Sequence, residues 1–331
     1  MGDIAIGRGR PGTAAADATA PGARRALQCA LAAIWLLDGV LQYQSSMFTK
    51  AFARMIGETS AGNPGVVAGP INWNATLVER HLVLANAIFA TIQLLIGLGI
   101  AWRPTVRLAL AASVVWSLGV WWFGEGLGGV LSGAAGPVNG APGAAIIYAL
   151  LAVLLWPADR PGVTAPFVAA RAVGATVARA LWLVLWGSLA YFALTPANRA
   201  PQALPDMVAG MASGEPGWLA ALDKHAAALL AGHGLAASIV LAVAFAIVAV
   251  GVYLPPSLLR ATLILGIVAA AVIWVFGEAF GEILTGGATD PNSGPPLAVA
   301  ALAYWPLATA TAALPRAGRR LPDERPEGIS A

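Results

Sequence analysis

Apolar runs separated by short polar segments make up most of this 331-residue chain. A helix needs about 20 mostly apolar residues to cross the hydrocarbon core of a bilayer. Eight candidate segments appear: 26–43, 82–102, 106–123, 144–156, 175–194, 234–254, 258–276 and 297–314. The fourth is short but can be extended backwards through Gly140. The pattern predicts an all-helical protein that crosses a membrane about eight times.

The composition supports a membrane protein and excludes other classes. Hydrophobic residues make up 58% of the chain and charged residues 11%, against about 25% charged residues in soluble domains. The net charge of +3 does not indicate nucleic-acid binding, because the arginines are scattered over short loops and tails. A single cysteine, Cys29, excludes a disulfide or a CxxC pair within this chain. The lipid bilayer is therefore the expected surrounding.

The basic residues predict an orientation. If both termini are cytoplasmic, 14 of the 19 Lys and Arg residues lie on the cytoplasmic side and five outside, as the positive-inside rule requires. We therefore expect a multi-pass protein of the cell (inner) membrane. Its long loops, 44–80, 124–143, 195–232 and 277–296, then face outwards.

Two loop sequences resemble each other. WWFGEGLGGVLSGAAGPVNG occupies 121–140 and WVFGEAFGEILTGGATDPNSG occupies 274–294. Aligning Glu125 with Glu278 gives an offset of 278 − 125 = 153, which also pairs Asn139 with Asn292. The match predicts a tandem duplication of a four-helix unit. Because each unit has an even number of spans, the repeats would be parallel, related by a pseudo-twofold axis along the membrane normal.

The predicted organisation has five parts. Residues 1–25 form a disordered cytoplasmic tail, 26–158 the first four-helix repeat, 159–174 a cytoplasmic linker, 175–315 the second repeat and 316–331 a cytoplasmic C-terminal tail.

Residues 85–116, ANAIFATIQLLIGLGIAWRPTVRLALAASVVW, and residues 35–44, WLLDGVLQYQ, carry a further likeness. A Gly-containing apolar helix, a short basic turn and a small-residue helix follow one another. The pattern resembles the DoxX/DoxD-like family of four-helix membrane proteins, here as a tandem duplication. The resemblance implies membrane redox chemistry, such as quinone reduction, and supplies no catalytic residues.

Several carboxylates stand out in this apolar chain. Glu125 and Glu278 follow Trp-containing helix ends and are expected at the outer membrane boundary. They are either solvated or bonded to backbone N–H groups of the following Gly-rich loop, which we favour, or they form a proton or cation site. Glu282 would share a helix face with Glu278 if the helix continued. Asp38 lies inside the first span. It has either a hydrogen-bonded packing role, which we favour, or a functional role, as a lone acid inside a membrane often does.

The remaining candidates are two asparagines and two histidines. Asn139 and Asn292 lie in predicted turns of the Gly-rich loops. His81 and His233 each begin an apolar helix at the outer side. They either cap these helices or, brought together by the pseudo-twofold axis, ligate a haem or, with the glutamates, a divalent metal.

Three functions remain open. The first, which the family resemblance favours, is an accessory subunit of a membrane redox process, with an outer vestibule, built from the duplicated FGE and Gly-rich loops, that binds a quinone, haem or metal. The second is a small-solute or proton-coupled transporter or channel. The third is a membrane scaffold for an extracytoplasmic protein. A redox partner or homo-oligomer is compatible with the first, and whether the protein is catalytic stays open.

Overall fold

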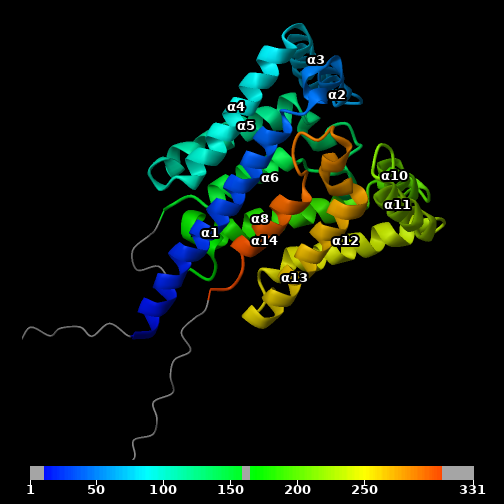
Figure 1. Cartoon of the computed structure of the whole chain (residues 1–331). Coiled ribbons are helices and arrows are strands. Elements are labelled where there is room, and N and C mark those ends of the chain that lie inside the picture. The colour runs from blue at the N-terminus through cyan, green and yellow to red at the C-terminus, as the bar shows by residue number, and fades with distance from the viewer. Residues whose placement is uncertain (1–10, 159–164, 308–331) are drawn as a thin grey trace, which may run out of the picture.

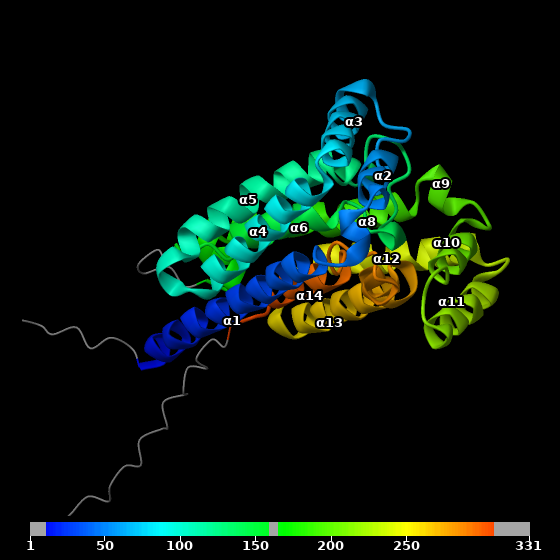
Figure 2. The ribbon, with the colours of Figure 1, turned by 45° about the horizontal axis from the view of Figure 1, so that its top comes forward.

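The computed structural model describes residues 11–158 and 165–307, and the side chains from residue 22 onwards. Within these ranges the chain is helical, and its one extended feature is an isolated bridge between Phe167 and Pro306. The long helices run side by side in a bundle (Figures 1 and 2). This confirms the predicted all-helical class.

Within the part of the chain that the structure describes, five helices are long and apolar enough to cross a membrane. They are α4 (Leu82–Ala101), α5 (Val106–Phe123), α8 (Ala175–Ala193), α12 (Gly234–Gly251) and α13 (Pro256–Val272). A π-turn, η5 (Ile273–Gly277), extends α13. Each of the five occupies a predicted apolar segment, and together they indicate a membrane protein.

Helix α1 (Pro11–Leu41) lies beside α4. It begins at Pro11, inside the segment 1–25 for which the sequence predicted disorder. Pro is favoured in the first turn of a helix, and the alanines that follow have high helix propensity. Residues 1–10 and the expected C-terminal tail, 316–331, lie outside the described residues.

Two expected spans are short helices, α6 (Ala144–Leu154) and α14 (Gly294–Ala303). Their 11 and 10 residues rise about 16 and 15 Å, roughly half of the hydrocarbon core. They pack against each other inside the bundle (Figure 1). Both helices follow long Gly-rich loops, so the chain reaches the interior before each helix begins.

The helices pack in corresponding pairs. α1 lies on α4 and α8 on α12, while α5 lies on α6 and α13 on α14. The largest fully buried side chains include Trp182, Trp186 and Phe245. These aromatic groups fill the space between α8 and α12.

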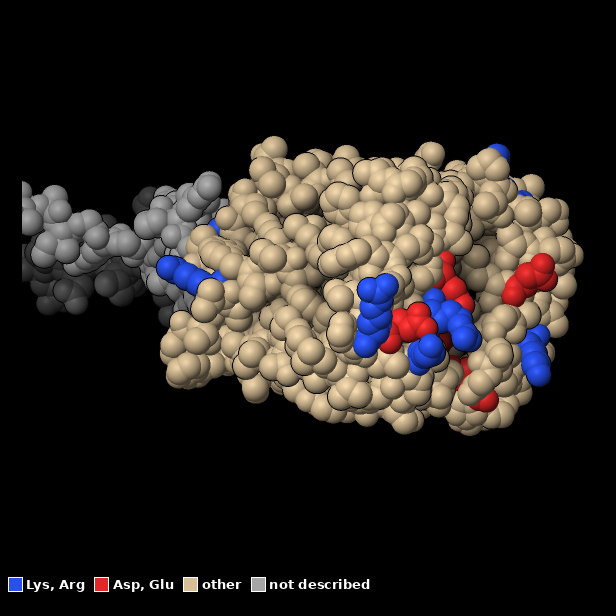
Figure 3. Space-filling model, turned by 90° about the horizontal axis from the view of Figure 1, so that it is seen from above, with Lys and Arg blue, Asp and Glu red and all other residues tan. Residues whose placement is uncertain are grey.

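The remaining elements are short. Most gather at one end of the bundle, which we call the loop end. They are η1 (Ser45–Phe48), α2 (Lys50–Glu58), α3 (Gly65–Arg80), η3 (Gly126–Gly129), η4 (Pro137–Asn139), α9 (Pro196–Arg199), α10 (Ala203–Met211), α11 (Gly217–Leu230) and η6 (Ala279–Thr285). At the opposite end lie η2 (Arg103–Thr105) and α7 (Val168–Val173). Charged side chains gather over the loop end, and most of the remaining face in Figure 3 has none.

We predict that Gly97→Val destabilises the α1–α4 contact. A Cβ at Gly97 would lie 2.8 Å from Leu36 Cγ and 3.0 Å from the Ala32 backbone oxygen, which cannot move aside. The expected cost is about 1–3 kcal/mol, typical of overpacking. Thermal melting of the purified protein in detergent measures it.

The matched control is Gly187→Ala in α8, where an added Cβ meets nothing within 4 Å. Its melting temperature should equal or exceed that of the wild type, because Ala is the better helix former. Equal melting temperatures for the two variants would contradict the packing described for Gly97.

Candidate functional site

The two Gly-rich loops begin with the same unusual backbone. Four consecutive residues have positive φ angles in each: 57°, 56°, 62° and 70° over Gly126, Leu127, Gly128 and Gly129, and 43°, 57°, 71° and 56° over Ala279, Phe280, Gly281 and Glu282. Side-chain-bearing residues rarely adopt this left-handed conformation. It stops the preceding helix abruptly and turns the chain into the bundle.

This backbone corrects the expectation for Glu282. The α-helix does not continue past Glu278, so the two carboxylates do not share a helix face. Glu282 itself is left-handed, with a φ of 56°, and exposed.

Glu125 and Glu278 hold the starts of the two short helices. Glu125 Oε1 accepts a hydrogen bond of 3.0 Å from the backbone N–H of Ala145 in α6. Glu278 Oε2 accepts one of 3.1 Å from Gly294 in α14, and its Oε1 accepts from the N–H and the hydroxyl of Ser293. Acceptors at a helix N-terminus stabilise it, because the first N–H groups have no partner within the helix. The glutamates do bond backbone N–H groups, but these belong to the starts of the following helices rather than to the Gly-rich loops as expected.

A tryptophan closes each loop in the same way. Trp121 Nε1 donates to the Pro142 oxygen at 2.7 Å, and Trp274 Nε1 donates to the Pro291 oxygen at 2.8 Å. Each tryptophan lies four residues before the glutamate of its loop. Helix end, glutamate and loop are therefore joined into one rigid unit on each side.

Burial raises the pKa of both glutamates. The pKa of Glu125 rises to about 8, through desolvation and the nearby Asp290 carboxylate, and the Ala145 N–H opposes this rise. The pKa of Glu278 rises to about 7, through desolvation, against hydrogen bonds from Ser293 and Gly294. Both groups therefore exchange protons near neutral pH.

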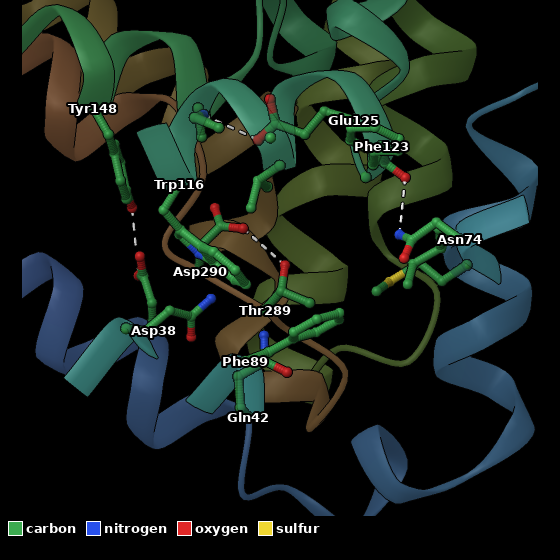
Figure 4. Close-up of a pocket in the computed structure, with 18 of the residues that line it drawn as sticks. Asp38, Gln42, Asn74, Phe89, Trp116, Phe123, Glu125, Tyr148, Thr289 and Asp290 are labelled. Carbon is green, nitrogen blue, oxygen red and sulfur yellow. Dashed lines mark hydrogen bonds between the residues drawn. The ribbon is translucent and has the colours of Figure 1, made fainter. Parts of the chain in front are cut away.

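Glu125 also borders a cavity of about 350 Å³ (Figure 4). Asp38 on α1 and Asp290, in the loop before α14, line the same cavity. Tyr148 on α6 donates a hydrogen bond of 3.4 Å to Asp38 Oδ1. Asp290 accepts from the Thr289 hydroxyl and from the Asn292 N–H, each at 2.7 Å. Three carboxyl groups from distant parts of the sequence thus meet in one space.

Seven aromatic residues form a large part of the cavity wall. Its rings are Trp35, Phe52, Trp73, Phe89, Trp116, Phe123 and Tyr148. Gln42 and Gln93 add two amides that are 3% and 8% exposed. No Lys, Arg or His is among the described residues of this wall. The site is therefore acidic and apolar at once.

A second cavity, which we call the vestibule, adjoins the first. It has a volume of about 480 Å³ and is lined by Glu58, Asn139, Asn292 and glycines of the first loop. Glu125 and Asp290 line both spaces. These two carboxyl groups therefore stand where the vestibule meets the inner cavity.

The inner cavity also reaches the apolar side of the bundle. Its wall includes Val115 on α5 and Trp73 on α3, which are 72% and 63% exposed. A ligand dissolved in the bilayer would meet the cavity at this side.

The two histidines are not brought together. His81 and His233 are exposed caps of α4 and α12. The α3–α4 and α11–α12 junctions lie in separate corners of the molecule (Figure 1). Among the described residues no group of three or more His, Cys, Asp or Glu side chains is arranged to hold a metal ion. The histidine pair proposed from the sequence therefore does not form a shared haem or metal site.

The two asparagines support the loops. Asn139 Oδ1 accepts from the Gly136 N–H at 2.8 Å, and its amide donates to the Ala134 oxygen at 3.1 Å. Asn292 has a φ of 63°, and its Oδ1 accepts from the Ser293 N–H at 2.8 Å. Both also line the vestibule.

Sequence reasoning missed four residues of the cavity: Tyr148, Asp290, Gln42 and Gln93. The glutamines carried a usable signal, because polar side chains inside apolar helices are costly and often functional. Asp290 gives no such signal, because an Asp followed by Pro is typical of a turn. Nothing near Tyr148 in the sequence distinguishes it from an ordinary aromatic residue.

Comparison of this chain with family models, curated proteins and solved structures finds no match. The likeness to the DoxX/DoxD-like family therefore stays a prediction.

We predict that Glu125→Gln makes the protein less sensitive to alkaline pH. The folded protein holds the Glu125 proton more tightly than the unfolded chain, whose ordinary pKa is 4.5. The resulting stability is complete below about pH 4.5 and is lost as the pH rises through about 8. The wild type should lose roughly 3–6 °C of melting temperature across this window. The variant keeps the oxygen that faces Ala145 and should lose less.

Asp206→Asn is the matched control, because Asp206 is exposed on α10 outside both cavities. It should follow the wild-type pH profile. The protonation of Glu125 would be refuted if Glu125→Gln kept the full wild-type pH dependence.

Proposed function

We propose that this protein is a proton-linked transporter of a small solute, with the inner cavity as its solute site. The observation that carries the proposal is the meeting of three carboxyl groups, with no basic partner, in a cavity joined to a vestibule at the loop end. Buried acids in membrane proteins commonly serve proton relays or solute pathways.

The two short helices add support. Transporter sites are typically built around discontinuous helices, and irregular backbone at membrane depth is tolerated where it lines a cavity. Helix α6 begins at the cavity, since Ala144, Ala145 and Tyr148 line it. The Gly-rich loop that precedes α6 lines the vestibule.

We also propose the full eight-helix arrangement, in which 26–158 and 175–315 are parallel repeats and the loop end faces outwards. Support comes from the matching left-handed turns and the matching glutamate contacts. Further support comes from reciprocal contacts between the halves: Gln44 Nε2 donates to the Ala288 oxygen at 3.0 Å, and Asn198 Nδ2 donates to the Ala135 oxygen at 2.8 Å. Ala135 and Ala288 differ by the same 153 residues.

In this arrangement the two halves have diverged. The offset that pairs Trp35 with Trp186 pairs Asp38 with Leu189, and the offset that pairs Ala145 with Gly294 pairs Tyr148 with Leu297. Leu189 and Leu297 are fully buried in the apolar core. The first half then contains the polar cavity. The equivalent region of the second half is filled by apolar side chains and has a structural role.

Each group has a role in the proposed cycle. Glu125 and Asp290, at the junction of the two spaces, exchange protons with water in the vestibule. Asp38, held by Tyr148, lies deeper and receives the solute. Solute and proton would then occupy the same carboxyl groups in turn.

Solute-driven proton movement in proteoliposomes tests the proposal. A trapped pH dye should report a flux in wild-type vesicles when a transported solute is added. The double variant Glu125→Gln with Asp290→Asn should reduce this flux at least tenfold, while Asp206→Asn should leave it unchanged. Equal proton flux in all three proteins would contradict the transport proposal.

A redox role is the second candidate, favoured by the side of the cavity near Val115 and Trp73, where a lipid-soluble quinone could enter. Tyr148 and Asp38 would then bind its oxygen atoms. Organic extraction of the protein purified in mild detergent should yield about one quinone per chain, and Asp38→Leu should remove it. A purified wild-type protein without quinone would count against this candidate.

A further inference from the structure

The hydrogen-bonding groups of the inner cavity indicate which ligand it accepts. Three oxygen atoms on its wall have no partner, and all three accept hydrogen bonds once Glu125 is ionised: Gln42 Oε1, Gln93 Oε1 and Glu125 Oε2. Both glutamines are more than nine-tenths buried. An unpaired buried acceptor costs about 1–3 kcal/mol. A ligand that donates several N–H groups to these oxygens would therefore gain the most.

Unpaired donors are fewer on the same wall. Trp116 Nε1 is the one unpartnered buried nitrogen among the described residues of the wall. A quinone or another ligand that only accepts hydrogen bonds would satisfy this donor and leave the three oxygens unpaired. The balance of groups favours a donor ligand.

The charge of the site favours a cationic ligand. Asp38 on α1, Glu125 after α5 and Asp290 before α14 line the cavity, with Tyr148 on α6 as the remaining titratable group. Glu58 on α2 adds a carboxylate to the vestibule. Anions are repelled by such a site, and a cation is attracted.

The aromatic groups accommodate the body of the ligand. Phe89 lies between Phe52 and Trp116, with ring centroids at 6.3 and 5.6 Å. Trp35 meets Tyr148 edge to face at 5.0 Å. Aromatic faces attract cations and also bury apolar surface. The volume of about 350 Å³ lies at the small end of ligand pockets, about 300–1,000 Å³.

We infer that the inner cavity binds a small organic cation that has an apolar body and a primary ammonium or guanidinium group. The cationic group lies among Asp38, Glu125 and Asp290 and donates N–H bonds to the glutamine oxygens. The apolar body lies against Phe89 and Trp116. This inference rests on the proposed function, since it names the solute of the same site.

Binding and protonation then exclude each other. A cation entering the protonated site displaces one proton from a carboxyl group, so charge is conserved and one proton leaves for each cation bound. Affinity should therefore rise with pH as long as the ligand stays charged.

The test uses three probes with the same phenyl body. They are 2-phenylethylammonium, its N,N,N-trimethyl derivative and neutral 2-phenylethanol. Calorimetry on the full-length protein in detergent, at pH 6.0 and 8.0 and in two buffers of different ionisation enthalpy, measures affinity and proton release. We expect the ammonium to bind at least tenfold more tightly than the alcohol, and more tightly than the trimethyl probe, which has no N–H. Its affinity should rise at least fivefold between the two pH values, with proton release.

Variants connect the binding to the site. Asp38→Asn and Gln93→Leu should each lower the affinity for the ammonium probe at least fivefold and leave the affinity for the alcohol nearly unchanged. Asp206→Asn is the control. Melting temperature and size-exclusion profile show whether each variant is folded, and Gln93→Glu, which keeps an acceptor oxygen, should retain binding if Gln93→Leu misfolds.

The outcomes separate this inference from the transport proposal. If the ammonium binds with proton release but moves no protons in proteoliposomes, the cation site stands and transport falls. If a neutral solute drives the flux and the alcohol binds as tightly as the ammonium, transport stands and the cation inference is overturned. If no probe binds, the inference is overturned whatever the flux.

Discussion

The carboxylates of Glu125 and Glu278 hold the N-terminal N–H groups of two helices that begin inside the bundle, and the candidate site depends on this contact. A helix that starts at a membrane surface can leave its first N–H groups to water. A helix that starts within the bundle has less water within reach, so an acceptor from the protein stabilises its first N–H groups. Glu125 supplies it for α6 and Glu278 for α14. Each loop then has to bring its glutamate back towards the following helix, and the left-handed turns accomplish this.

The same constraint creates the cavity. Because α6 and α14 are short, the space above each start is closed by a loop rather than by helix. Loops pack less completely than helices, and the first loop leaves a vestibule lined by its own glycines. Asp290 reaches this space from the loop before α14, so the acidic cavity is built jointly by the two parts of the chain. An acidic site without a basic partner is then tuned by protons and by whatever cation enters it.

Some side-chain contacts occur in both Gly-rich loops, and others occur only at the cavity. The glutamate and tryptophan contacts occur in both loops, and they serve the fold. Asp38, Tyr148 and Gln93 occur once, and they serve the cavity. Around Trp182, Trp186 and Phe245 the space is filled with aromatic rings. The contacts found in both loops thus support the fold, and the residues found in one place only line the cavity.

The pattern of apolar runs was enough to predict the helices α4, α5, α8, α12 and α13 to within four residues at each end, because a span in lipid must be apolar along its whole length. It also identified Glu125, Glu278 and Asp38, since a carboxylate is conspicuous in such a chain. It could not give the length of α6 and α14, whose apolar runs continue into loops that only packing terminates. Nor could it place Asp290 and Tyr148 beside Asp38, which lies 252 and 110 residues away in the sequence. The hydropathy of a segment depends only on its own residues, so the sequence determines it. Whether three carboxyl groups meet depends on which helices face one another, and only the tertiary structure decides that.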